Sequence, residues 1–336
     1  MASIIDVSKY AHVSTATVSR VFNNSASVNA ETRARVLNAA EQLGYIPKSP
    51  VGKRNPFDGK IVAVVLPDTR NAFYTDLVSG LEICLKQNGF SVLEAGTDES
   101  PDIEFHHICT LFKMNISALV LVPTFGIRAD TIGNLLKLEN SGIPVVLMDR
   151  DIRGSNFDGV FMDNHSAAYN STMELLRNGH RNIAFLAGSN ESRGNIDRFR
   201  GFCDAFTDFG LEPNKDYVIN GEFHFKEAYE NTKSFLQKHE EITAVFSSSR
   251  RMTSGCLFAF AELGKRIGED ISIVCCGRPN VGSGILSYID YPSNDMGKEC
   301  SRIICDRLMS ETAASLSRRV FLNTRLVLRG SEKYNF

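Results

Sequence analysis

Three features that would place a chain in a membrane or outside the cell are missing from this sequence of 336 residues. No apolar run approaches the roughly 20 residues that a helix needs to cross a bilayer. The N-terminus has no charged segment before an apolar core, so no signal peptide is predicted. The eight cysteines are scattered, which favours reduced thiols over a disulfide framework. These absences predict a cytoplasmic protein without membrane association.

No motif typical of catalysis or metal binding is found either. The sequence has no phosphate-binding Gly-Lys-Ser/Thr loop, no Gly-x-Ser-x-Gly nucleophile elbow and no Cys-x-x-Cys pair. The adjacent Cys275 and Cys276 lack the spacing that metal ligation needs. The histidines are dispersed, and His106, His107 and His180 are expected to be surface or structural residues. We therefore expect a binding protein with no catalytic residue, cofactor or metal, rather than an enzyme.

The net charge of −2 conceals a difference between the two ends of the chain. Residues 1–57 hold seven Lys and Arg against three Asp and Glu, whereas the rest is acidic. A chain of this length exceeds one ordinary core, so two or three globular units are expected. We assign 1–46 to a head, 47–59 to a linker and 60–336 to a body. A basic head on an acidic body is typical of a nucleic-acid-binding module joined to a domain of another function.

The head contains three short helical patterns. Ser3 and Asp6 fit a capping box at the start of the first helix, and Ser14 is a natural N-cap for the second. Asn29 opens the third pattern, whose apolar residues recur at helical spacing. Because only residues 12–14 separate the first two helices, the pattern predicts an all-α helix-turn-helix head.

The second helix exposes a short polar face at its N-terminal end. Arg20 can pair with guanine, and Ala16 or the methyl of Thr15 can contact a thymine methyl. Other polar side chains suit DNA phosphates, which fix the register without reading sequence. These expected phosphate contacts are Ser3, Ser14, Ser19 and Asn23. An ordinary three-helix subdomain with a solvated polar face fits the same pattern, and the residues alone leave both interpretations open.

In the body, apolar runs alternate with helical patterns, which predicts α/β lobes with parallel sheets. Ile61–Leu66 is a continuous apolar run, as expected of a strand buried on both faces. A second series of strands begins near Ile183. Crossovers near 162–164 and 290–294 predict two Rossmann-like lobes with a cleft between them. The N-lobe is assigned to about 60–162 and 292–320, and the C-lobe to about 163–291 and 321–336.

Segments along nearly the whole chain resemble the LacI/GalR family of transcription regulators. The matching segments are Ile4–Ala11, Val13–Val21, Glu31–Val36, Leu43–Pro47, Leu66–Asp68, Asn71–Tyr74, Gly179–Leu186, Arg198–Phe202 and Leu328–Ser331. The resemblance implies a helix-turn-helix head on a periplasmic-binding-protein-like body. It also implies a homodimeric repressor on a palindromic operator, with Thr15, Ala16 and Arg20 reading bases and a small-molecule effector in the cleft. A solute-binding protein without a regulatory role would share the body but lack the head.

Two departures from the family pattern lie in the head and the linker. His12 stands where glycine is usual in the turn, and histidine is among the residues that adopt positive φ. Residues 47–56 hold three prolines and a glycine where relatives usually have a hinge helix. We expect a basic arm at the DNA minor groove, formed by Lys48, Val51, Lys53 and Arg54. The alternative is a solvated linker whose charges act by weak, salt-sensitive steering.

Ligands of open parallel sheets bind at the carboxyl ends of the strands, which identifies candidate residues of the cleft. The residues expected to bind an effector are Asn71, Phe73, Phe125, Asp149, Arg150, Arg198, Arg250 and Arg278. The resemblance implies that Phe73 packs on a sugar and that Arg198 hydrogen-bonds to it.

The cleft departs from the family at two further points. Arg250 and Arg278 occupy segments where relatives commonly carry sugar-holding amide and carboxylate groups. Arginine cannot accept the hydrogen bonds of sugar hydroxyls, but it binds anions in a bidentate manner. The effector is therefore expected to be a sugar, and more specifically a sugar acid or sugar phosphate. A degenerate cleft whose arginines pair with carboxylates would instead predict a regulator that needs no ligand.

Overall fold

The computed structural model describes residues 3–22, 28–43, 60–279, 284–309 and 316–334. The chain divides into two compact units, Met1–Asp58 and Gly59–Phe336. This division separates the predicted head from the predicted body. Among the described residues, no helix is long and apolar enough to span a membrane. No group of three or more His, Cys, Asp or Glu side chains among them is placed to hold a metal ion.

The described residues of the head form three helices, α1 (Ile4–Tyr10), α2 (Thr15–Phe22) and α3 (Ala30–Gln42). One apolar face of each helix contributes to a small core. Its buried members are Val7, Ala11, Val18, Val21, Val36, Ala39 and Ala40. The three helical patterns of the sequence are therefore confirmed, and the polar face of α2 remains outside this core.

Side-chain caps start the helices where the sequence predicts them. Ser3 and Asp6 form a complete capping box at α1. Ser14 accepts a hydrogen bond at 3.1 Å from the backbone amide three residues on, and Asn29 caps α3 in the same way at 2.8 Å. His12 has a φ of 52°, so the turn keeps a left-handed residue without glycine. These contacts define the helix-turn-helix locally.

The N-lobe contains a six-stranded sheet in the order β11-β5-β4-β3-β1-β2, with every neighbouring pair parallel. Its strands are β1 (Ile61–Leu66), β2 (Ser91–Gly96), β3 (Ala118–Leu121), β4 (Val145–Met148), β5 (Asp158–Met162) and β11 (Arg319–Leu322). Its helices are α4 (Ala72–Gln87), α5 (Pro101–Lys113), α6 (Ala129–Asn140) and α11 (Ser293–Met309). Almost all of β1 is buried, as its apolar run predicts.

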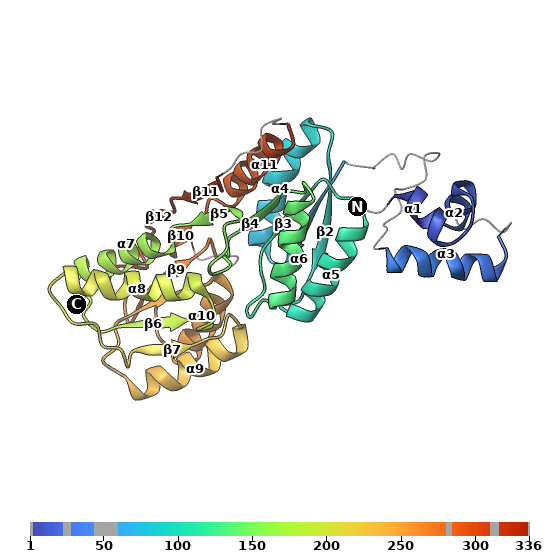
Figure 1. Ribbon diagram of the computed structural model, residues 1–336. Coiled ribbons are helices and arrows are strands. Elements are labelled where there is room, and N and C mark those ends of the chain that lie inside the picture. Colours follow the sequence, from blue (N-terminus) through green and yellow to red (C-terminus); the bar gives the residue numbers. More distant parts are fainter. Residues whose placement is uncertain (1–2, 23–27, 44–59, 280–283, 310–315, 335–336) are drawn as a thin grey trace. The chain divides into compact units, whose positions relative to one another are not determined.

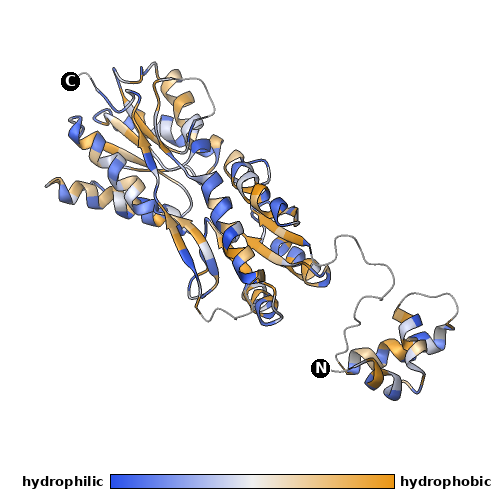
Figure 2. Ribbon diagram, turned by 90° about the horizontal axis from the view of Figure 1, so that it is seen from above, coloured by the Kyte–Doolittle hydropathy of each residue, from blue (hydrophilic) through white to orange (hydrophobic). Residues whose placement is uncertain are grey.

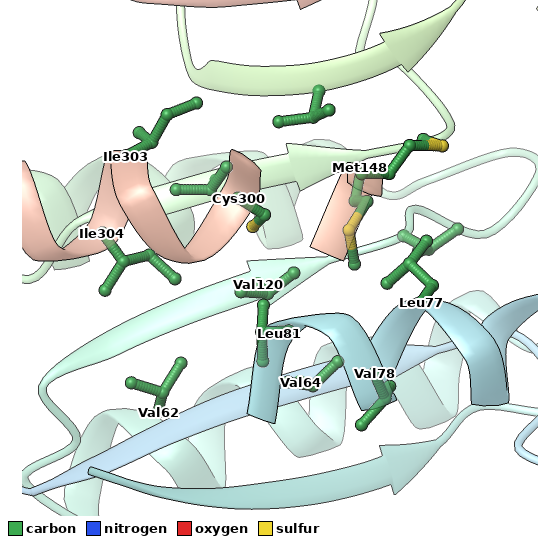
Figure 3. Close-up of a cluster of buried hydrophobic side chains, with 14 of the residues drawn as sticks. Val62, Val64, Leu77, Val78, Leu81, Val120, Met148, Cys300, Ile303 and Ile304 are labelled. Carbon is green, nitrogen blue, oxygen red and sulfur yellow. The ribbon is translucent and has the colours of Figure 1, made fainter. Parts of the chain in front are cut away.

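Helices cover both faces of this sheet. Helices α4 and α11 lie side by side over one face (Figure 1), and their aliphatic side chains pack with those of the strands (Figure 3). Leu81 and Ile303 are fully buried there beside Val64. The next residue of β1, Val65, packs in the core that α5 and α6 form on the opposite face. The alternation of strand side chains thus supplies both cores.

The C-lobe contains a second six-stranded sheet in the order β12-β10-β9-β8-β6-β7. Its strands are β6 (Ile183–Ala187), β7 (Val218–Asn220), β8 (Ala244–Ser247), β9 (Ser272–Cys276), β10 (Ser287–Asp290) and β12 (Arg325–Val327). Its helices are α7 (Asn164–Arg177), α8 (Arg193–Asp208), α9 (Phe225–Lys238) and α10 (Arg250–Glu262). The edge strand β12 pairs antiparallel with β10, so the expectation of wholly parallel sheets is corrected at this edge. Figure 2 shows mostly hydrophobic strands in both lobes.

The chain crosses between the lobes three times. It passes from β5 to α7, from β10 to α11 and from β11 to β12. The first two crossings agree with the sequence analysis. The third lies at 323–324, because β11 continues to Leu322 in the N-lobe sheet before β12 begins in the other. The predicted boundary near 320 therefore comes a little too early.

Gly297 makes the close packing of α4 on α11 possible. A Cβ atom at this position would lie 2.0 Å from the carbonyl oxygen of Leu77, and one at Gly80 would lie 2.0 Å from that of Asn294. Backbone atoms cannot yield as a flexible side chain would. The two glycines therefore determine how near the helices can lie.

We expect Gly297→Ala to destabilise the body by about 2 kcal/mol, because the added methyl overpacks a backbone contact. Gly133→Ala is the matched control, since a Cβ at Gly133 in α6 meets nothing within 4 Å. This control should be neutral or stabilise by about 0.5 kcal/mol. Denaturant unfolding of both variants tests the expectation, and equal free energies of unfolding would contradict it.

Candidate functional site

The carboxyl ends of the strands open on one large cleft between the lobes of the body. Its volume is about 1070 Å³, and both lobes contribute lining residues. All eight residues named as effector contacts lie on its walls: Asn71, Phe73, Phe125, Asp149, Arg150, Arg198, Arg250 and Arg278. The structure therefore brings together side chains that are up to about two hundred residues apart in sequence.

Aromatic side chains form the end of the cleft near α4. Asn71 caps this helix by accepting a hydrogen bond from the Phe73 amide at 3.1 Å. The Phe73 ring meets Tyr74 edge-on at 5.2 Å and Tyr291 edge-on at 5.7 Å between centroids. Tyr74 donates a long hydrogen bond of 3.4 Å to Asp149. Burial raises the pKa of Asp149, an effect that the nearby Arg150 opposes.

Arg150 is already engaged by the protein. Its Nη1 atom donates to both carboxylate oxygens of Glu99, at 2.5 and 3.0 Å, and to the carbonyl of Pro123 at 3.0 Å. The guanidinium lies 3.8 Å from the ring centroid of Phe125. A charge in this half-buried position is stabilised by its ion pair. The charge of Arg150 is therefore already paired, and its partner Glu99 is a cleft residue that the sequence analysis did not name.

Two carboxyl groups hold the loop that follows β3. Glu99 accepts a hydrogen bond from the Phe125 amide at 3.3 Å, and Glu104 accepts one from the Thr124 amide at 2.7 Å. Glu104 is fully buried, and its second oxygen has no hydrogen-bond partner among the described residues. Burial raises the pKa of Glu104 to about 7. This carboxyl therefore positions the Phe125 wall at a cost in stability.

Further side-chain contacts among the described residues join the lobes across the cleft. Phe125 of the N-lobe stacks on Phe223 of the C-lobe, with ring centroids 6.0 Å apart and planes 12° apart. Phe223 has a φ of 58°, and its ring lies so close over Gly188 that a Cβ there would be 2.1 Å away. Arg250 donates a 3.4 Å hydrogen bond to Asn71 on the opposite lobe. Phe223 is a second cleft residue that the sequence analysis did not name.

Arg198 is buried in the C-lobe wall, and no carboxylate of the described residues lies within 4.0 Å of its side chain. Its Nε atom donates to Asn164 at 3.0 Å and its Nη1 atom donates to the carbonyl of Ser248 at 2.9 Å. The guanidinium lies 5.9 Å from the ring centroid of Tyr291. Neutral oxygens thus orient this charge but do not neutralise it, which is the arrangement expected of an anion or polar-ligand contact.

In the head, the three expected base-reading residues share the exposed face of α2. Thr15, Ala16 and Arg20 are exposed, as the prediction requires. The hydroxyl of Ser3 donates a hydrogen bond to Asp6 at 2.7 Å within the capping box. Ser3 is therefore less available to bind a phosphate. Ser14 is exposed and Ser19 is half-buried. The remaining candidates, Asn23, Lys48, Val51, Lys53 and Arg54, lie outside the described residues.

Two family models match these two parts of the chain. Residues 3–48 match the model of the lacI family of bacterial regulatory proteins. Residues 59–312 match the model of periplasmic binding proteins and the sugar binding domain of the LacI family, which covers well over half of the chain. The chain belongs to the LacI family. The recognition of this family from sequence segments, and the predicted fold class, are confirmed.

Relatives of this LacI-family chain match it along almost its whole length. Catabolite control protein A of Priestia megaterium is 27% identical over 317 residues, covering 93% of this chain and 94% of that protein. The HTH-type transcriptional repressor PurR of Aliivibrio salmonicida is 28% identical over 338 residues, covering 98% and 99%. A transcriptional regulator CelR–cellobiose complex superposes with a TM-score of 0.73 at 26% identity, covering 98% and 100%. The chain is a DNA-binding transcription regulator, and these relatives are regulators rather than enzymes.

The raised pKa of Glu104 predicts a pH-dependent stability. Its folded pKa of about 7 lies above the unfolded value of 4.5, so the folded chain retains a proton that the unfolded chain releases. Stability should therefore fall as the pH rises from 4.5 to 7. Glu104→Gln should not show this decrease, because glutamine does not ionise. Relative to the wild type, its free energy of unfolding should rise by about 2 to 3 kcal/mol between pH 5 and pH 8.

Urea unfolding at pH 5 and pH 8 measures this difference. Glu82→Gln is the control, because Glu82 is exposed on α4. A gain for Glu104→Gln that is the same at both pH values would show that Glu104 is ionised in the folded chain.

Proposed function

We propose that the chain is a homodimeric repressor that binds a palindromic operator and responds to a small polyhydroxylated effector in the interlobe cleft. The observation that carries the proposal is the combination of two sites in one chain. The head exposes Thr15, Ala16 and Arg20 on a capped helix, and the body forms a cleft of about 1070 Å³ at its strand ends. A solute-binding protein would have no use for the head.

The dimer follows from the size of the reading face. One eight-residue helix contacts too few base pairs for useful specificity. A two-fold symmetric dimer places one such helix on each of two half-sites and so doubles the number of base pairs that are read. We place the dimer contact on the body, with α4 contributing. Ile83 on this helix is 52% exposed and is available for such a contact.

Two observations support the assignment of the effector to the cleft: the geometry of the cleft and the ligands of similar solved structures. Parallel strands end there, aromatic rings form one end of the cleft, and Arg198 contributes a buried charge. Among solved structures, the CelR regulator is a cellobiose complex, and a regulator from Enterococcus faecium, at 22% identity and a TM-score of 0.72, has bound ribose. A ligand that prefers one arrangement of the lobes would shift operator affinity through the change in that arrangement.

A regulator that needs no ligand is the second candidate. The pairing of Arg150 with Glu99 and the stacking of Phe125 on Phe223 favour it, because both contacts hold the cleft together without a ligand. The two candidates predict the same operator but differ in whether small molecules alter its affinity.

Selection of bound sequences from a random DNA pool tests the head. We expect the full chain to select a palindrome, and Arg20→Ala to bind it about tenfold or more weakly with relaxed preference at one symmetric position. Arg35→Ala is the control, because Arg35 is an exposed arginine of α3 and not of the reading helix. Weak binding without a consensus, equal in the wild type and Arg20→Ala, would contradict the proposal.

A further inference from the structure

The two walls of the cleft differ in charge. Carboxylates predominate on the N-lobe wall, which holds Asp68, Arg70, Asp76, Asp98, Glu99, Asp149 and Arg150. Arginines predominate on the C-lobe wall, which holds Arg198, Glu222, Arg250, Arg251 and Arg278, with Asp290 at its edge. A ligand in this cleft therefore meets acceptors on one side and cationic donors on the other.

On the N-lobe wall, both arginines are already paired. Arg70 bonds to Asp68 at 3.0 Å and lies 3.5 Å from Asp98, and Arg150 bonds to Glu99. Asp149 is the half-buried carboxylate of this wall that has no cation within 4.0 Å among the described residues. Its oxygens are therefore available to accept hydrogen bonds from ligand hydroxyls.

On the C-lobe wall, three arginines form no ion pair with any carboxylate that the structure describes. Arg198 and Arg250 donate to neutral oxygens, and no described carboxylate lies within 4.0 Å of either side chain or of Arg278. Asp290, at the edge of this wall, pairs instead with Arg325 at 3.0 Å. Among the described residues, these three arginines therefore form no ion pair with a carboxylate within 4.0 Å.

The topology brings these three arginines together. Arg278 follows β9, Arg250 follows β8, and Arg198 lies on α8, the helix that follows β6. These strands are adjacent in the order β9-β8-β6, and in parallel strands the carboxyl ends meet at one edge. Arg250 is also the first residue of the thirteen-residue helix α10, whose N-terminus adds positive potential at the same edge.

We propose that this edge is an anion subsite, and that the effector is a polyhydroxy compound with one carboxylate or phosphate group. The acidic group binds Arg198, Arg250 and Arg278, and hydroxyl groups donate to Asp149 on the opposite wall. This inference rests on the proposed effector cleft and specifies its ligand. A neutral sugar places no negative charge against the buried guanidinium of Arg198, whereas an anion can bind it through bidentate hydrogen bonds.

Calorimetric titration of the full chain at constant ionic strength tests the subsite. The probes are inorganic phosphate, gluconate, glucuronate, glucose 6-phosphate and ribose 5-phosphate, with glucose and ribose as the neutral counterparts. We expect the acidic sugars to bind at least tenfold more tightly than the neutral ones, because each charged hydrogen bond adds to affinity. Tighter binding of either the phosphates or the carboxylates identifies the acidic group.

Arg250→Gln and Arg278→Gln should each weaken binding of the acidic sugars and of inorganic phosphate by about tenfold. Both side chains reach the cleft from half-buried or exposed positions, and unchanged melting temperatures without ligand verify that the variants fold. Arg200→Gln is the matched control, since Arg200 lies on α8 with 59% of its side chain exposed and is not part of the cleft wall. Its affinities should equal those of the wild type.

The outcomes separate this inference from the function on which it rests. Binding of glucose or ribose alone, unchanged in both glutamine variants, would overturn the anion subsite and leave the effector cleft in place. Absence of binding by every probe would overturn both the subsite and the effector, and would favour the ligand-independent regulator. Acidic binding that Arg200→Gln weakens as much as Arg278→Gln would show a general effect of charge and overturn the subsite.

Discussion

The positions of the functional residues in the body depend on one constraint, the three crossings of the chain between two parallel sheets. Because the crossings lie between β5 and α7, β10 and α11, and β11 and β12, the strand ends of both sheets open on one cleft. Both walls are built from loops that a rigid sheet supports. A small change in the angle between the lobes therefore alters contacts across the cleft without disturbing either core.

The contacts across the cleft provide a physical basis for such a change. The Phe125–Phe223 stack and the Arg250–Asn71 hydrogen bond are broken if the lobes separate. A ligand stabilises the closed arrangement only if it binds that arrangement more tightly than the open one. Oppositely charged walls meet this condition, because one ligand can contact both of them only when they are close together.

Much of the fold was predictable from local sequence. The caps at Ser3, Ser14 and Asn29, the left-handed turn at His12 and the buried run of β1 all follow from short-range rules and are confirmed. The edge strand of the C-lobe sheet was harder to predict from the sequence. A three-residue strand has too few residues for its pattern to show its direction, so the antiparallel β12 was missed.

The cleft shows where sequence reasoning ends. The strand-end rule placed eight residues on its walls, but the ends of β2 and β7 were not considered, and these supply Glu99 and Phe223. Arg150 is paired with the carboxylate of Glu99, which lies 51 residues away in the sequence. The periodicity of apolar residues does not predict such a long-range pair. Residues on the walls could therefore be predicted, whereas the charges that remain available to a ligand required the structure.

The most direct test of the account is the operator affinity of the full chain with and without a saturating ligand of the cleft. The account predicts that the ligand changes the dissociation constant for the operator by about fivefold or more, and that the operator changes the affinity for the ligand by the same factor. A ligand that binds the cleft equally well in the free and operator-bound protein would contradict the account, because the cleft would then not be coupled to the DNA-binding head.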